Sequence, residues 1–222
     1  MWRLRLNMDN HISLGDAERK FFLGVYRSAV AAYQPRIEKK TGVALGDISV
    51  WDYSQMREHV LMQGLPIIRR LRRFVFSRRL RRQAENLRVV CEESATKCSA
   101  AYYRNGIYVS FSSGTAHEEV VAAAVVHELA HALWERLARK PLTWRPKRQF
   151  WGKYKLFAEG FATYAETIWF LDLYPIAVKR AVQGAYIDPQ GVHYRGMCQI
   201  EDLVRKHGQQ ILFEIPKRWQ SM

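Results

Sequence analysis

Two histidines four residues apart constrain this chain more than any other feature. They belong to the run His127-Glu128-Leu129-Ala130-His131. In an α-helix, residues four apart lie on one face, about 6 Å apart along the axis, so both imidazoles can bind one metal ion. Glu128 lies at the edge of this face and can reach a metal-bound water as a general base. The alternative is a histidine pair satisfied within the core. The motif favours a metal site, because burying a polar trio without partners costs free energy.

The motif lies within a helix predicted from about Ala116 to Arg139. Thr115 and Glu118 have the spacing of a capping box, and Pro141 follows the last turn. The apolar residues around the motif are Val126, Leu129, Ala130, Leu133 and Leu137. We therefore expect this helix to pack against the core beside its histidine face.

A third metal ligand is sought downstream, because catalytic zinc takes three protein ligands and keeps one open position. Glu159 is the candidate. It stands among apolar residues near the start of a second predicted helix, over residues 156–173. Glu166 lies seven residues further on the same face, and it either orients a ligand histidine or is itself the ligand. Gly160 is expected to let this helix approach the first.

At this point the sequence resembles a known family. The runs HELAHALW and AEGFATYAE are similar to those of the gluzincin metallopeptidases, especially the compact single-domain minigluzincins. The resemblance covers residues 105–173. It implies a small sheet whose edge strand, Ile107 to Phe111, lines the cleft and pairs with extended substrate. It also implies an active-site helix over residues 118–139 and a glutamate helix over residues 156–171. Many gluzincins carry an aspartate that braces a ligand histidine four residues after the third ligand. Thr163 occupies that position here, and Glu166 is the candidate replacement.

The remaining pattern predicts an α+β fold in one domain, residues 1–222. Strands cluster in the first half and helices follow, which gives a small antiparallel or mixed sheet beside the two site helices. A hairpin is predicted around Asn105-Gly106, a pair typical of type I′ turns. The predicted parts are 1–100 (helices at 16–40 and 55–88, strand at 47–53), the catalytic core 101–173, and the helical part 174–222 (a helix at 194–207 closed by Gly208, and one at 209–213 before Pro216).

The charge of the chain is strongly positive and uneven. The formal net charge is +14. Much of the excess lies in the basic segment 67–88, where residues 69–88 hold nine arginines and one acid, and in residues 145–155, which hold five basic residues and no acid. Such a surface attracts nucleic acid or an acidic partner, or it is only a solvated face; the sequence leaves both readings open.

The cysteines and the apolar runs indicate the cellular compartment in which the protein is expected. Three cysteines at irregular spacing (Cys91, Cys98 and Cys198) imply no disulfide framework, and free thiols are expected. The N-terminus lacks the apolar region of a signal peptide, and the longest apolar run, Val120 to Val126, is too short to span a bilayer. A cytoplasmic protein is the expectation.

The function expected from these features is zinc-dependent hydrolysis of peptide bonds. Zinc polarises the scissile carbonyl and activates water, and Glu128 takes the proton and passes it to the leaving amine. His193 or Tyr194 is the candidate donor to the oxyanion, although Tyr194 is equally compatible with ordinary packing. A second hypothesis is a nucleic-acid-associated protease similar to SprT-type proteins, whose third ligand is usually histidine. A third is a latent proenzyme (a zymogen) or a metal-binding scaffold, in which the first 100 or last 30 residues block the cleft.

Overall fold

The computed structural model describes residues 16–52, 55, 100–103, 105–109, 118–138, 150–184 and 189–219. Over these residues the protein is mostly helical with a small mixed sheet, which confirms the α+β expectation at that level. Several predictions lie outside the described residues: most of the helical segment 55–88 with its arginines, Thr115 of the capping-box pair, residues 110–111 of the predicted edge strand, and the basic loop from 139 to 149.

The sheet has three described strands in the order β1-β3-β2. β1 (Ser49–Asp52) runs parallel to β3 (Gly106–Val109), and β2 (Ala100–Tyr103) runs antiparallel to it. The expectation that the strand starting at Ile107 is an edge strand is therefore wrong over its described part. β3 is the central strand because both β1 and β2 pair with it, and all four of its residues are buried.

The hairpin is confirmed, but its turn is displaced by one residue from the predicted pair. Gly106 already pairs with Tyr103 inside the sheet, and Asn105 adopts the left-handed conformation with φ 61°. Asparagine tolerates this conformation better than most residues do. A Cβ atom on Gly106 would lie 3.0 Å from the ring of Tyr108, so a larger residue at this strand position would press against that buried ring.

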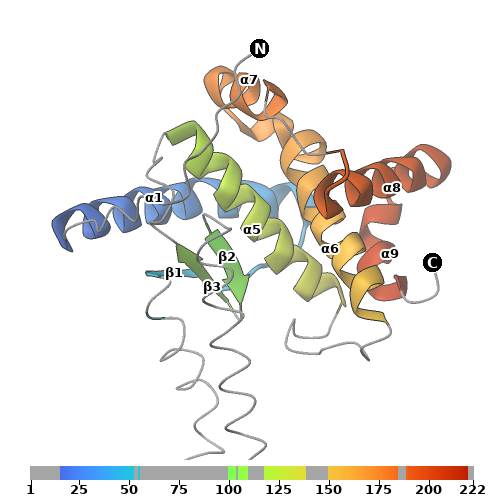
Figure 1. Cartoon of the computed structure of the whole chain (residues 1–222), viewed down its shortest axis with the longest axis horizontal. Helices are drawn as coiled ribbons and strands as arrows, with labels where there is room; N and C mark the ends of the chain where they lie inside the picture. Colours follow the sequence, from blue (N-terminus) through green and yellow to red (C-terminus); the bar gives the residue numbers. More distant parts are fainter. Residues whose placement is uncertain are drawn as a thin grey trace, which may run out of the picture.

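Helix α5 (Glu118–Ala138) lies at the centre of the molecule (Figure 1). The sheet lies on one side of it, with α6, α8 and α9 on the other. α1 (Asp16–Thr41) and α7 (Ile176–Gly184) also pack against α5. The middle of α5 is almost entirely buried, with Val125, Leu129 and Leu133 fully inaccessible. The apolar face expected around the histidines is therefore the core of the fold.

The second site helix begins earlier and ends differently than predicted. α6 spans Trp151–Tyr164, and its first turn includes Tyr154, whose buried ring packs edge-on against Trp134 and Trp219. These aromatic contacts anchor a turn that was predicted as loop. After α6 the chain continues as a π-helix, Ala165–Trp169, and a 3₁₀ turn, Leu171–Leu173.

The C-terminal helices cover α6 and the end of α5. α8 spans Val192–His207 and ends at Gly208, whose φ of 78° confirms the predicted stop. α9 spans Ile211–Arg218 and includes Pro216, which was expected to follow the helix. Pro216 is buried together with Ile215, and it has no backbone N–H to donate within the helix. Within the described residues, no helix is both long and apolar enough to cross a bilayer.

Candidate metal centre

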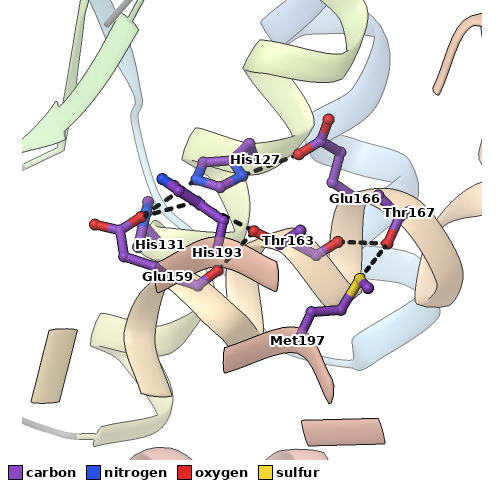
Figure 2. Close-up of polar contacts among 8 residues, drawn as sticks. All are labelled: His127, His131, Glu159, Thr163, Glu166, Thr167, His193 and Met197. Carbon is purple, nitrogen blue, oxygen red and sulfur yellow. Dashed lines mark hydrogen bonds and ion pairs between the residues drawn. The ribbon is translucent and has the colours of Figure 1, made fainter. Parts of the chain in front are cut away.

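Two imidazoles and one carboxylate converge between α5 and α6 (Figure 2). His127 and His131 project from α5 with ring centroids 5.0 Å apart. Glu159 projects from α6, and its Oε2 lies 3.6 Å from His127 Nε2 and 3.3 Å from His131 Nε2. One ligand atom from each of the three residues lies within 4.8 Å of the others. This set of donors fits a divalent metal, since two imidazole nitrogens and a glutamate oxygen are a known catalytic zinc set.

The electrostatics of the cluster favour positive charge between these side chains. Burial alone would raise the pKa of Glu159, but His131 and His127 outweigh it and hold that pKa well below its usual range. Burial alone would lower the pKa of His127, but hydrogen bonds with Glu159 and Glu166 raise it well above its ordinary value. A bound cation would therefore meet an ionised Glu159 and would compete with the proton on His127.

Glu128 lies on α5 between the two histidines but contacts a different element. It is only 7% exposed, and its Oε2 accepts a hydrogen bond of 2.5 Å from the backbone N–H of Tyr102 in β2. Burial raises the pKa of Glu128, while the histidines lower it. The grouped ligand atoms are those of His127, His131 and Glu159. The role of Glu128 as base stays a prediction, and the contact with Tyr102 was not foreseen.

Glu166 faces the other side of the His127 ring. Its Oε2 lies 2.9 Å from His127 Nδ1, whereas Glu159 faces Nε2 of the same ring. Glu166 is the second residue of the π-helix, a widened turn that often marks functional sites. Of the two roles left open for Glu166, this position favours orienting His127 over binding the metal, because a ligand imidazole commonly donates its second ring N–H to a carboxylate.

His193 reaches the cluster from α8, while the neighbouring Tyr194 does not. His193 Nδ1 lies 3.7 Å from Glu159 Oε2 and 3.3 Å from Thr163 Oγ1, and half of the imidazole remains exposed. The Thr163 hydroxyl itself donates to the backbone carbonyl of Glu159. Tyr194 is exposed, and its pKa is raised by a hydrogen bond with Cys198 on the same helix. The structure therefore brings His193, of the two candidate donors, to the site.

A glycine pair sets the distance between α6 and α8. A Cβ atom on Gly160 would lie 2.2 Å from the carbonyl carbon of Gly196, and one on Gly196 would lie 2.2 Å from the carbonyl oxygen of Leu156. Gly160 was expected to admit α5, but it faces α8 instead. This crossing lies one turn from His193 on α8 and one turn from Thr163 on α6, so it brings these two side chains together.

Comparison with protein-family models, with curated proteins and with solved structures found no match. The functional reading of this chain therefore rests on the geometry of the site. Three residues that shape the site were missed, or were assigned another role, when the sequence was analysed alone: Tyr102, Thr163 and Gly196. The position of Gly196 three residues after His193 was the one available signal, since glycine inside a helix costs stability and usually has a packing reason.

Proposed function

We propose that this protein is a zinc-dependent metallopeptidase of the gluzincin type. His127, His131 and Glu159 would hold the metal. The observation that carries the proposal is the convergence of His127 Nε2, His131 Nε2 and Glu159 Oε2 from two packed helices, with Glu128 next to both histidines. A histidine pair satisfied in the core would need neither the third group nor the second carboxylate, Glu166, on the outer ring nitrogen.

Zinc at this position supplies Lewis acidity toward a peptide carbonyl and toward water. Three residues of the chain would carry out the other steps. Glu128 would take up the proton of the attacking water at its carboxylate and deliver it to the leaving amine. His193, half-exposed beside Glu159, would donate a hydrogen bond to the carbonyl oxygen as negative charge develops there. Glu166 fixes the plane of the His127 ring through Nδ1.

The metal content of purified protein tests the ligand assignment. We expect about one zinc per chain by elemental analysis, lost in His127→Ala and in His131→Ala, because each variant removes one of three protein ligands. His207→Ala is the matched control, since His207 is exposed at the end of α8. Zinc that stays at the parent level in both ligand variants would overturn the site.

Peptidase activity tests the reaction class. The zinc-loaded chain is incubated with fluorescently labelled casein and with a mixture of unrelated peptides, and the products are identified by mass spectrometry. Metal-dependent cleavage supports the peptidase. Tight zinc binding without cleavage supports the metal-binding scaffold or the latent form. The nucleic-acid-associated reading depends on residues 69–88, which lie outside the described residues, so it stays a prediction from charge alone.

A further inference from the structure

Strand β2 presents one backbone N–H group to the active-site helix. In the antiparallel pair, Tyr102 lies opposite Ile107, and its N–H donates to Glu128 and not to β3. Ala101 and Tyr103 point the other way, because successive residues of an antiparallel strand alternate between neighbours. β2 is the outermost described strand on this side of the sheet. The Tyr102 N–H is therefore available to a partner outside the described sheet, and Glu128 is that partner.

Tyr102 is anchored to α5 at two points. Its N–H donates to Glu128, and its hydroxyl donates to Glu135 Oε2 at 2.9 Å, two turns further along the helix. Asn105 provides a third connection between the hairpin and α5. It donates its N–H to the Tyr102 hydroxyl and accepts a hydrogen bond from Arg136 of α5. These contacts fix the position of β2 along α5, and so they fix the direction from which the Tyr102 N–H meets the carboxylate.

We propose that the main-chain N–H of Tyr102 is the positioning group for Glu128. It holds Oε2, so that Oε1 is the carboxylate oxygen left to take up a proton. Both residues are buried, at 9% and 7% exposure, so water competes weakly for this hydrogen bond. The inference rests on the proposed function, in which Glu128 is the general base. It makes the hairpin part of the catalytic apparatus in addition to any contact with substrate.

A purely structural role is the competing explanation. A buried N–H at a sheet edge needs an acceptor, and Glu128 could serve only to satisfy it. The two explanations differ in what happens when this N–H is removed. A structural contact changes the free energy of unfolding, whereas a positioning contact also lowers kcat at unchanged KM and has no effect once Glu128 has lost its basicity.

Hydrogen exchange tests the contact without any substrate. The Tyr102 amide of the zinc-loaded protein is followed by ¹⁵N NMR in the parent and in Glu128→Ala. We expect a protected amide in the parent and exchange roughly tenfold or more faster in the variant, because the variant lacks the acceptor. The Tyr103 amide, which points into the sheet, is the control. Fast exchange at Tyr102 in the parent, or no response to Glu128→Ala, overturns the inference.

Replacement of one amide by an ester tests the positioning. Tyr102 is replaced by its α-hydroxy acid, which removes the N–H and keeps the side chain. The control is the same replacement at Ala101, which removes one N–H that points to β3. We expect kcat on labelled casein to fall roughly ten- to a hundredfold at residue 102 relative to the control, the usual effect of losing a hydrogen bond to a charged group. In Glu128→Gln the same ester should add nothing.

The outcomes separate this inference from the proposed function. Equal kcat for the two esters in an active enzyme overturns the positioning role and leaves the peptidase standing. A zinc-loaded parent that cleaves neither casein nor the peptide mixture overturns the proposed function and, with it, the catalytic part of the inference. In that case the exchange measurement still decides whether Tyr102 holds Glu128.

Discussion

The helix pair α5–α6 and the facing helix α8 contribute to the same site in different ways. α5 and α6 supply the grouped ligand atoms, and the three side chains that carry them are mostly buried. α8 supplies His193, whose side chain is 49% exposed and which meets the cluster at longer distances. The spacing of the α5 histidines follows from the helical repeat, whereas the position of His193 depends on how closely two separate helices approach. We therefore expect the three ligand side chains to keep their positions when α8 moves. The position of His193, in contrast, should change when a single methyl group is added between α6 and α8.

The largest expected effect concerns Glu128, and it separates the proposed general base from the proposed metal ligands on the same helix, α5. Glu128→Gln keeps the size of the side chain and removes its basicity, so any peptidase activity should drop by about 10²–10⁴, the usual worth of general acid–base catalysis. Zinc content and fold should be unchanged, because Glu128 is not among the grouped ligands. The measurements are steady-state cleavage and elemental analysis.

Glu135→Gln is the matched control for this variant, since Glu135 lies on the same helix and a glutamine there keeps an oxygen acceptor for the Tyr102 hydroxyl, so that β2 stays in position. Activity close to that of the parent is expected for it. A Glu128→Gln enzyme that keeps the activity of the parent would show that another residue is the base.

Gly196→Ala tests the contrast between the cluster and α8 directly. The added methyl would meet the backbone of α6, so α8 must move away. We expect a loss of roughly 1–3 kcal/mol in the free energy of unfolding by denaturant titration, which is typical of overpacking. We also expect reduced activity, because His193 moves with α8, but zinc binding that changes far less.

Gly152→Ala is the control for this helix crossing. Gly152 lies in the first turn of α6 with nothing within 4 Å of an added Cβ atom. This variant should be neutral or more stable, by up to about 1 kcal/mol, since alanine favours helix more than glycine does. Equal free energies of unfolding for the two variants would show that the α6–α8 crossing at Gly196 tolerates a methyl group, and the contrast between the cluster and α8 would be wrong.

Glu166→Ala tests whether the π-helix supports the cluster from outside. Loss of an outer partner of a ligand histidine typically weakens metal affinity about 10–100-fold. Glu159→Ala should weaken it far more, because Glu159 is the direct ligand in the proposed site. The measurement is zinc competition with a chelator, and Glu201→Gln is the control, because the half-exposed Glu201 side chain lies on α8 and pairs with Arg205. The reverse order of the two losses would move the third ligand to Glu166.

The smallest expected effect concerns the hydroxyl that holds His193. Thr163→Val removes the contact with His193 Nδ1 and keeps the shape of the side chain. We expect a severalfold lower kcat, in line with about 1 kcal/mol for one hydrogen bond, and unchanged zinc affinity. Thr167→Val is matched to it, because Thr167 also donates to the carbonyl four residues earlier but contacts Met197 and not His193. Equal kcat for the two variants would remove Thr163 from the site.

Local patterns identified the site helices and most of the described elements. The helices near 16–40 and 194–207 and the hairpin were confirmed to within about two residues. Each depends on the period of apolar residues or on a turn residue, and both are properties of neighbouring positions in the chain. The largest failures, the edge-strand assignment and the partner helix of Gly160, involve long-range packing. The strand from Ile107 is central because β1, more than fifty residues earlier, pairs with it.

The sequence by itself determined the two histidines on one helical face, because the repeat of the α-helix fixes their separation whatever surrounds them. It also supplied Glu159 as an acidic residue on a second helix. Only the tertiary structure decided which groups complete the site. The Tyr102 N–H, the Glu166 carboxylate and the His193 ring reach it from a strand, a π-helix and a third helix. Their positions depend on strand order and on a backbone approach between two glycines, and residue spacing along the chain encodes neither of these.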